Sequence, residues 1–328
     1  MAMRFWLLLV FIFSADLIKA QDQTTPVSDS VQVKRWVFVS YDNDAHFKSD
    51  YYYTQGVRAA YYSEMLQNKG ITKILLNWPG SQSRTGFIIV NDAFTPIEIE
   101  PTEIQYGDRP FAGYVYLGII RRAVKPEQGL LFTSEFDVGV MGPWSGAKPV
   151  QTRLHTWLQN AIPHGWKNQI AHDVVLNYNL QLEKRLLEKK NIAGLYAVSG
   201  LRAGTLYSDL SGGFTACLGS TEAFRNNAYV PNQISRNAYR KLQVYLQASA
   251  IGKLVGYNAT MQGGVFNEKN CVYTLEAPDI DRLVGRGGVG VGVTFRGTML
   301  EYDLFRETPE FNGGKWHNFS RIRGGIRF

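Results

Sequence analysis

The sequence predicts a transmembrane antiparallel β-barrel of about twelve strands, and three observations support this fold class. Aromatic residues make up 13% and glycines 32 of the 328 residues, whereas charged residues are only 19%. The longest uninterrupted apolar run, Phe5 to Phe13, has nine residues, and a membrane-spanning helix needs about 20. Segments of about ten residues alternate between polar and apolar side chains, which is the length and pattern of a tilted strand crossing a bilayer.

The N-terminus predicts export. Arg4 precedes the apolar run, and small residues follow at Ala15 and Ala20, which is the arrangement of a signal peptide. We expect a signal peptide over residues 1–20, with cleavage after Ala20. A polar segment over residues 21–34 is expected to be loose, and the barrel domain is expected to span residues 35–328.

The strands are predicted from alternation with a period of two. It is clearest in residues 130–140, 174–183, 242–250 and 288–295. A soluble β-sandwich would alternate too, but the strand length and a terminal Phe328 that closes an alternating strand favour an outer-membrane barrel. The predicted strands are residues 35–42, 53–64, 86–93, 111–123, 129–141, 172–187, 192–208, 210–219, 241–256, 283–295, 298–308 and 316–328.

One insertion, residues 149–166, predicts a short helix in an extracellular loop, ended by Pro163 and Gly165. Its apolar residues recur at helical spacing: Val150, Leu154, Trp157, Leu158 and Ala161. Because loops carry function more often than barrel walls do, this helix is a candidate part of a site.

The net charge narrows the class of molecule that the protein could bind, and the cysteine count limits the disulfides that it could form. Arg4 and Lys19 against Asp16 give the signal peptide a net charge of +1, so the rest of the chain carries +6 of the total +7. A basic exported protein suits an anionic lipid or polysaccharide rather than nucleic acid. Cys217 and Cys271 are the two cysteines, and a disulfide between them is left open. We expect a monomer in the bacterial outer membrane.

A run of oxygen-bearing side chains follows the first predicted strand. Asp42, Asn43 and Asp44 are consecutive, and Asp50 and Thr54 come shortly after. Such side chains at a strand end are suited to a hard cation such as calcium. The alternative is a turn stabilised by Asp and Asn side chains.

Two further groups are candidates for chemistry or binding. His155 follows Gln151 by four residues on the predicted helix, so both side chains share a face and the histidine could act as an oriented general base; the alternative is a surface histidine. Asp108 and Arg109 precede a predicted strand, where they could anchor a loop or bind a lipid phosphate. The GxSxG motif of serine hydrolases is absent.

Taken together, these motifs resemble the outer-membrane lipid A 3′-O-deacylase family. The resemblance rests on their order along the chain: Tyr41-Asp42-Asn43-Asp44, YTxG at 53–56, GDRPFAGY at 107–114, GVMGP at 139–143, QxxxH at 151–155 and PxGWxNQ at 163–169. It covers nearly all of the mature chain, with its motifs concentrated in residues 40–170.

The resemblance implies a twelve-stranded barrel that hydrolyses the 3′-linked acyl esters of lipid A at the outer leaflet, dependent on calcium. It implies that Asn43 and Asp44 form the Asn-Asp pair of the active site and hold the metal. It also implies that Thr54 and Gln151 belong to that site and that His155 is the base.

The sequence departs from the family at two places. The family's Glu six residues after the histidine falls on Ala161, or on Asn160 with one gap, and its Lys-Arg pair for the lipid head group falls near residues 98–101, where no basic residue stands. These departures keep a structural barrel with a degenerate site as an alternative. A passive pore, which would conduct ions across planar bilayers, is the other alternative.

Overall fold

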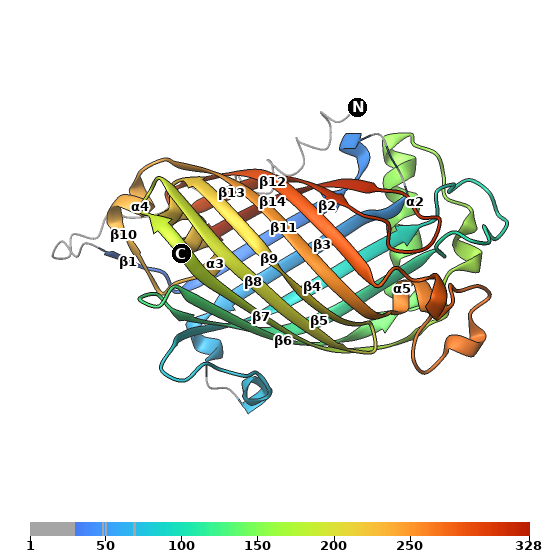
Figure 1. The fold of residues 1–328 in the computed structure, drawn as a ribbon, viewed down its shortest axis with the longest axis horizontal. Helices are drawn as coiled ribbons and strands as arrows, with labels where there is room; N and C mark the ends of the chain where they lie inside the picture. The colour runs from blue at the N-terminus through green and yellow to red at the C-terminus, as the bar shows by residue number, and fades with distance from the viewer. Residues whose placement is uncertain (1–29, 48, 50, 68–69) are drawn as a thin grey trace.

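The computed structural model describes residues 30–47, 49, 51–67 and 70–328, so the predicted signal peptide lies outside the described residues. In this part of the chain, twelve strands form one closed antiparallel barrel in sequence order, and β14 pairs with β2 to close it (Figure 1). Each predicted strand overlaps one of them, which confirms the fold class. The strands are β2 (Arg35–Asn43), β3 (Tyr52–Ser63), β4 (Gln82–Thr95), β5 (Ala112–Lys125), β6 (Leu130–Met141), β7 (Asp173–Lys189), β8 (Ala193–Gly204), β9 (Tyr207–Gly219), β11 (Gln243–Asn258), β12 (Leu283–Phe295), β13 (Thr298–Glu307) and β14 (His317–Arg327).

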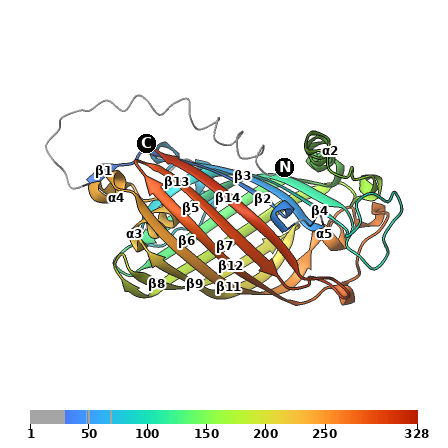
Figure 2. The ribbon, with the colours of Figure 1, turned by 90° about the horizontal axis from the view of Figure 1, so that it is seen from above.

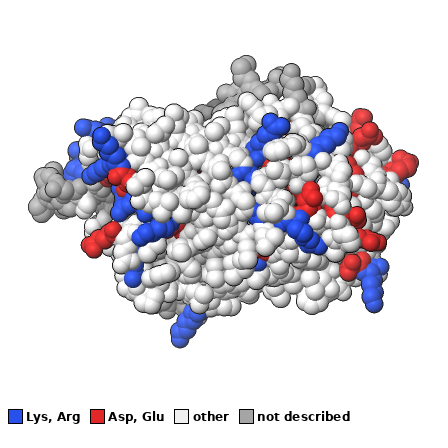
Figure 3. Space-filling view, viewed as in Figure 1, with Lys and Arg blue, Asp and Glu red and all other residues white. Residues whose placement is uncertain are grey.

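The apolar side of the alternation faces outward. In β7, Val174 and Leu176 are 41% and 39% exposed, whereas Val175 and Asn177, on the other face, are buried. Figure 3 shows the result on one face of the molecule, where charged side chains gather toward the two ends and a largely uncharged band lies between them. This surface is what a barrel surrounded by lipid requires.

The two ends of the barrel differ. One end, which we name the α2 end, carries α2 (Ala147–Leu158) and α5 (Ala259–Gln262) (Figures 1 and 2). The other end, the terminal end, carries the chain's C-terminus, α3 (Thr221–Tyr229), α4 (Arg236–Arg240) and a small sheet. That sheet pairs β1 (Ser30–Gln32) with β10 (Gln233–Ser235). Short 3-10 helices complete the connections: η1 (Ala45–Phe47), η2 (Glu64–Leu66), η3 (Gly70–Ile74), η4 (Gly142–Ser145), η5 (Gly165–Asn168), η6 (Glu268–Asn270) and η7 (Ala277–Asp279).

Helix α3 crosses the lumen at the terminal end. Its Asn227 donates to the Tyr245 hydroxyl of β11 at 2.9 Å and accepts from Arg327 of β14 at 2.9 Å. Arg122 of β5 donates to the carbonyl oxygen of Ala228 in α3. Because β5, β11 and β14 are well separated around the barrel, these bonds fix α3 across its interior.

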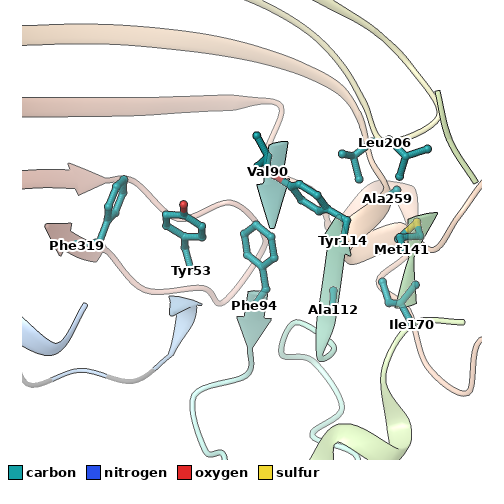
Figure 4. Packing of buried hydrophobic residues seen from close by; sticks show 11 residues of the cluster. Tyr53, Val90, Phe94, Ala112, Tyr114, Met141, Ile170, Leu206, Ala259 and Phe319 are labelled. Carbon is teal, nitrogen blue, oxygen red and sulfur yellow. The ribbon is translucent and has the colours of Figure 1, made fainter. Parts of the chain in front are cut away.

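The lumen is also filled toward the α2 end. The Tyr53 ring lies between the rings of Phe94 and Phe319, with centroids 5.3 and 5.0 Å away, and Tyr114 lies beyond Phe94 (Figure 4). The Tyr53 hydroxyl donates to Asp42 at 2.9 Å. Aromatic packing and buried polar bonds therefore occupy the part of the lumen nearest the long loops.

A network of ion pairs lies next to this aromatic layer. Asp42 accepts from Arg58 of β3 at 2.9 Å and from Arg321 of β14 at 2.7 Å, and Arg58 reaches Asp92 of β4 at 2.8 Å. Both carboxylates are almost fully buried. A buried charge needs such partners, so these strands are linked through the lumen as well as through their backbones.

The N-terminal segment differs in part from the prediction. Residues 21–34 were expected to be loose, but Ser30–Gln32 pairs with β10, and Val33 is buried with its N–H donating to the Asn232 carbonyl oxygen at 2.8 Å. The prediction is wrong for residues 30–34, because the connection between β9 and β11 offers them a strand edge that the sequence pattern did not reveal.

The loop helix is confirmed but shorter than predicted. It ends at Leu158 because Gln159 adopts a left-handed conformation with φ of 58°, and Gly165–Asn168 forms a separate 3-10 helix. Among the described residues, no helix has the length and apolar character needed to cross a membrane.

The two cysteines are free thiols. Cys217 is buried in β9, whereas Cys271 lies in the connection between α5 and β12, where its sulfur accepts from the Ala171 N–H at 3.3 Å. Burial raises the pKa of the Cys271 thiol. The disulfide that the sequence left open is therefore not formed.

Candidate functional site

The candidate residues gather on the outside of the barrel wall, at the α2 end, where α2 lies against β4 and β5 (Figure 2). Close approach depends on Gly113 of β5, where an added Cβ would lie 2.3 Å from the Cβ of Ala147. Ala147 and Trp166 pack with Ala93 and Phe111 in one buried cluster. The helix is therefore held directly against the strands.

Thr54 reaches the outer side of the wall through a β-bulge. The pairing of β3 with β4 shifts between Tyr53 and Gln55, and the extra residue of a bulge re-aims a side chain. Tyr53 points into the lumen toward Asp42, while the Thr54 hydroxyl lies 3.4 Å from Gln151 Nε2 on α2. Thr54 also donates to the carbonyl oxygen of Ala93 at 3.4 Å.

Gln151 is fixed between the wall and the loop that follows α2. Trp166 Nε1 donates to Gln151 Oε1 at 2.7 Å, which leaves the Nε2 side of the amide facing Thr54. Gln151 and Trp166 are both 1% exposed. The sequence analysis gave Trp166 no role, although this residue stands in the PxGWxNQ motif. The motif singles out the position, but it does not reveal that the indole contacts Gln151.

His155 lies one turn after Gln151 on the buried face of α2 and is 6% exposed. Its Nδ1 is 2.6 Å from the carbonyl oxygen of Ala161. Because a carbonyl oxygen accepts only, Nδ1 carries the proton, and in the neutral ring Nε2 carries the lone pair. The Ala161 position, where the resembled family has a glutamate, thus supplies a backbone acceptor instead.

The left-handed turn after α2 creates this contact. Gln159 at φ 58° reverses the chain, its N–H returning to the His155 and Thr156 carbonyl oxygens. The N–H of Asn160 also donates to the His155 carbonyl oxygen, at 2.9 Å. The turn brings Ala161 back over the imidazole, a closure that side-chain periodicity could not predict.

Asn43 and Asp44 lie at the end of β2, beside Thr54. Asn43 Nδ2 donates to the Thr54 carbonyl oxygen at 2.8 Å, and its Oδ1 accepts from the Ala45 N–H at 2.8 Å. Asp44 is 2% exposed, and its Oδ2 accepts from the Tyr51 N–H at 3.1 Å. These contacts have the form of the Asx turn that the sequence kept as an alternative, and they place a carboxylate and an amide against the site.

The donors here are of the kind that calcium prefers. Asp44, Asn43 and Thr54 each carry a side-chain oxygen, the kind of ligand that suits a hard cation. In the described ranges, no group of three or more His, Cys, Asp and Glu side chains converges, so backbone and amide oxygens would have to complete the coordination. The donor chemistry fits calcium, and the metal stays a prediction.

Asp108 and Arg109 anchor a loop of the α2 end. Arg109 is 1% exposed, reaches Glu310 at 3.0 Å and donates to Thr260 at 2.9 Å. Asp108 accepts from the Ile97 N–H at 2.7 Å, and its burial raises its pKa. These contacts correspond to the loop-anchoring alternative, and a role in substrate binding stays a prediction.

The chain is similar to known outer-membrane proteins in sequence and in fold. The model of the family described as "Outer membrane protein LpxR" matches residues 5–328. Among solved structures, LpxR from Salmonella typhimurium superposes with a TM-score of 0.73 at 19% identity, covering 89% of this chain and 100% of that one. The β-domain of the Bordetella autotransporter BrkA covers 92% of this chain and 99% of its own, with a TM-score of 0.41 at 10% identity.

No curated protein matches the sequence. The solved LpxR structure supports the fold, since 19% identity carries no more than that. The family match is different in kind, because it extends over nearly the whole sequence and includes every candidate residue described above. The chain belongs to the LpxR family of outer-membrane proteins.

Proposed function

We propose that the protein is a lipid A deacylase of the outer membrane, an esterase that removes 3′-linked acyl chains. Family membership supports deacylation at the family level. The observation that carries the proposal is the position of the site: α2, which carries His155, lies on the outside of the wall (Figure 2), and its Gln151 meets Thr54 of β3 there rather than in the lumen. A lipid substrate within the leaflet would approach a site on this side of the wall without entering the lumen.

His155 is the proposed general base. Its Nδ1–H bond to the Ala161 carbonyl oxygen fixes the ring and directs basicity to Nε2. There it would take a proton from water as the water oxygen attacks the ester carbonyl carbon. When the carbon–oxygen ester bond breaks, the imidazolium returns the proton to the leaving alkoxide, so the products are a fatty acid and a sugar hydroxyl.

The other residues orient the reactants. Gln151 is held by Trp166, so its amide nitrogen can position the water or an ester oxygen without a large loss of side-chain entropy. Asn43 and Thr54 lie on adjacent strands and are linked by a hydrogen bond. Asp44 and Asn43 would hold calcium, whose positive charge would stabilise the oxyanion.

The filled lumen argues against the passive pore. Over the described residues, α3 occupies the terminal end, the aromatic layer occupies the α2 end, and the ion pairs of Asp42 lie nearby. A structural barrel with a degenerate site is the other alternative. The connected bonds from Trp166 through Gln151 to Thr54 favour an assembled site.

Mass spectrometry of lipid A tests the proposal. Cells that produce the protein are compared with cells that produce the His155→Ala variant and with cells that lack both. We expect a mass loss equal to an acyl or acyloxyacyl unit with the wild-type protein alone. Identical lipid A in all three, with the barrel folded in the membrane, would contradict the proposal.

Substitution of Gly113 tests the contact between helix and wall. In Gly113→Ala the added methyl would lie 2.3 Å from the Ala147 Cβ, so α2 must move outward by about 1 Å. A displacement of that size typically costs about 100-fold in rate, and we expect that loss in deacylation assays. Gly212→Ala is the control because its Cβ would find nothing closer than 3.9 Å. Equal activity of the two variants would refute the requirement for close packing.

A further inference from the structure

Helix α2 buries polar side chains against the barrel and exposes apolar ones. Its buried residues are Ala147, Gln151 and His155, while the apolar Val150 and Trp157 are 46% and 50% exposed. A helix on a water-soluble protein normally buries its apolar side. The reversal indicates that the outer side of α2 faces an apolar or interfacial environment.

The charges of α2 have one sign. Lys148 and Arg153 are exposed, and the helix contains no acidic residue, not even in the first turn where the helix dipole favours one. Val150, Arg153 and Trp157 recur at i, i+3 and i+7, so they share one face. We name this set the outward face of α2. Lys148, two residues before Val150, lies instead toward the side of Gln151 and His155, which follow it at i+3 and i+7. An aromatic residue with cations is typical of a helix lying in a membrane interface.

This face continues the lipid-facing surface of the barrel. Ile89 of β4 and Leu117 of β5 are cross-strand partners on the strands that α2 contacts, and they are 49% and 57% exposed. Val138 of β6 extends the same row and is 49% exposed. The outward face of α2 therefore lies at the edge of the apolar band, where head groups begin.

The neighbouring loop is unsuited to anions. Residues 96–111 carry Glu98, Glu100, Glu103 and Asp108 against a single cation, Arg109, which is buried and paired with Glu310. Lys167 of η5 is within electrostatic reach of Glu103. Lys148 and Arg153 are exposed cations on the helix that forms one wall of the site.

We infer that the exposed side of α2 binds the phosphorylated head group of an anionic glycolipid of the outer leaflet, with Arg153 on the outward face and Lys148 at the edge beside the site facing phosphate, and with Val150 and Trp157 entering the acyl boundary. The inference rests on the proposed function for the identity of the lipid. It assigns phosphate recognition to the helix that carries His155, so substrate binding and base placement are linked through one element.

Equilibrium binding of glycolipid to the detergent-solubilised full-length protein tests the inference. The probes are lipid A with two phosphates and the same lipid after enzymatic removal of both. Each cation near an anionic surface contributes about 1 kcal/mol, so Lys148→Gln with Arg153→Gln is expected to weaken binding of the bisphosphorylated lipid by about 30-fold. Binding of the phosphate-free lipid should not change.

The matched control is Lys189→Gln with Lys190→Gln, two exposed cations near the turn between β7 and β8 at the terminal end. Trp157→Ala should weaken binding of both lipids, because it removes apolar contact rather than charge. If the double Lys148/Arg153 variant binds both lipids as the wild type does, the inference is wrong. Phosphate-dependent binding without any hydrolysis would instead contradict only the proposed function.

Discussion

Replacing His155 with glutamine is expected to lower the rate of lipid A deacylation by about 10²- to 10⁴-fold, the usual contribution of a general base. Glutamine keeps a polar side chain that can still donate to the Ala161 carbonyl oxygen, so the turn after α2 should persist. What it removes is a nitrogen that can take a proton from water. The rate constant at saturating substrate should therefore fall, while binding of the glycolipid should change little.

The measurement is the rate of fatty-acid release by purified protein in mixed micelles. His164→Gln is the matched control, because His164 is an exposed histidine of the same loop whose backbone, not its ring, contacts Ile99. Circular dichroism should show an intact barrel in both variants. Full activity of His155→Gln would remove His155 from the mechanism.

Asp44→Asn is expected to reduce the rate of deacylation by about 10²- to 10³-fold, which is the range seen when a group that stabilises an oxyanion is removed. The same substitution should also weaken calcium binding. The wild-type protein treated with a chelator should show the same loss and should recover when calcium is restored. Calcium affinity measured by titration calorimetry gives a readout that does not depend on catalysis. Unchanged calcium affinity in Asp44→Asn would refute the assignment of the metal ligand.

Asp42→Asn is an informative comparison because Asp42 stands only two residues earlier. It faces Arg58 and Arg321 in the lumen, and removal of a buried partner charge leaves the arginines uncompensated. We expect a lower unfolding temperature with calcium binding retained. Comparison of the Asp42→Asn and Asp44→Asn variants should thus distinguish a carboxylate that stabilises the barrel from one that binds calcium.

The strands were predictable because each strand shows its two environments in its own sequence. Side chains of β7 alternate between lipid and lumen, and that alternation appears in any sequence whose two faces meet different surroundings. Helix α2 was predictable from its periodicity, but its orientation was not. The usual rule that apolar residues point inward fails where the surroundings are lipid, so Val150 and Trp157 face out and Gln151 faces in.

The site was less accessible to sequence reasoning, since its residues come from distant segments. Asp42, Asn43 and Asp44 looked like one oxygen-rich group, yet strand alternation turns Asp42 into the lumen and leaves Asp44 at the strand end. The acceptor for His155 is a backbone carbonyl, for which no residue type is diagnostic. The contact of Trp166 with Gln151 depends on the left-handed turn at Gln159.

By itself, the sequence determined a closed β-barrel with a loop helix, because strand parity and a chain without a long apolar run admit few other folds. It also specified which residues carry the resemblance to the LpxR family. Only the tertiary structure decided that the bulge at Thr54 and the turn at Gln159 bring Thr54, Gln151 and His155 together outside the wall. The physical reason is that local patterns record which face of an element is apolar, whereas backbone irregularities and contacts between distant segments depend on how the whole barrel closes.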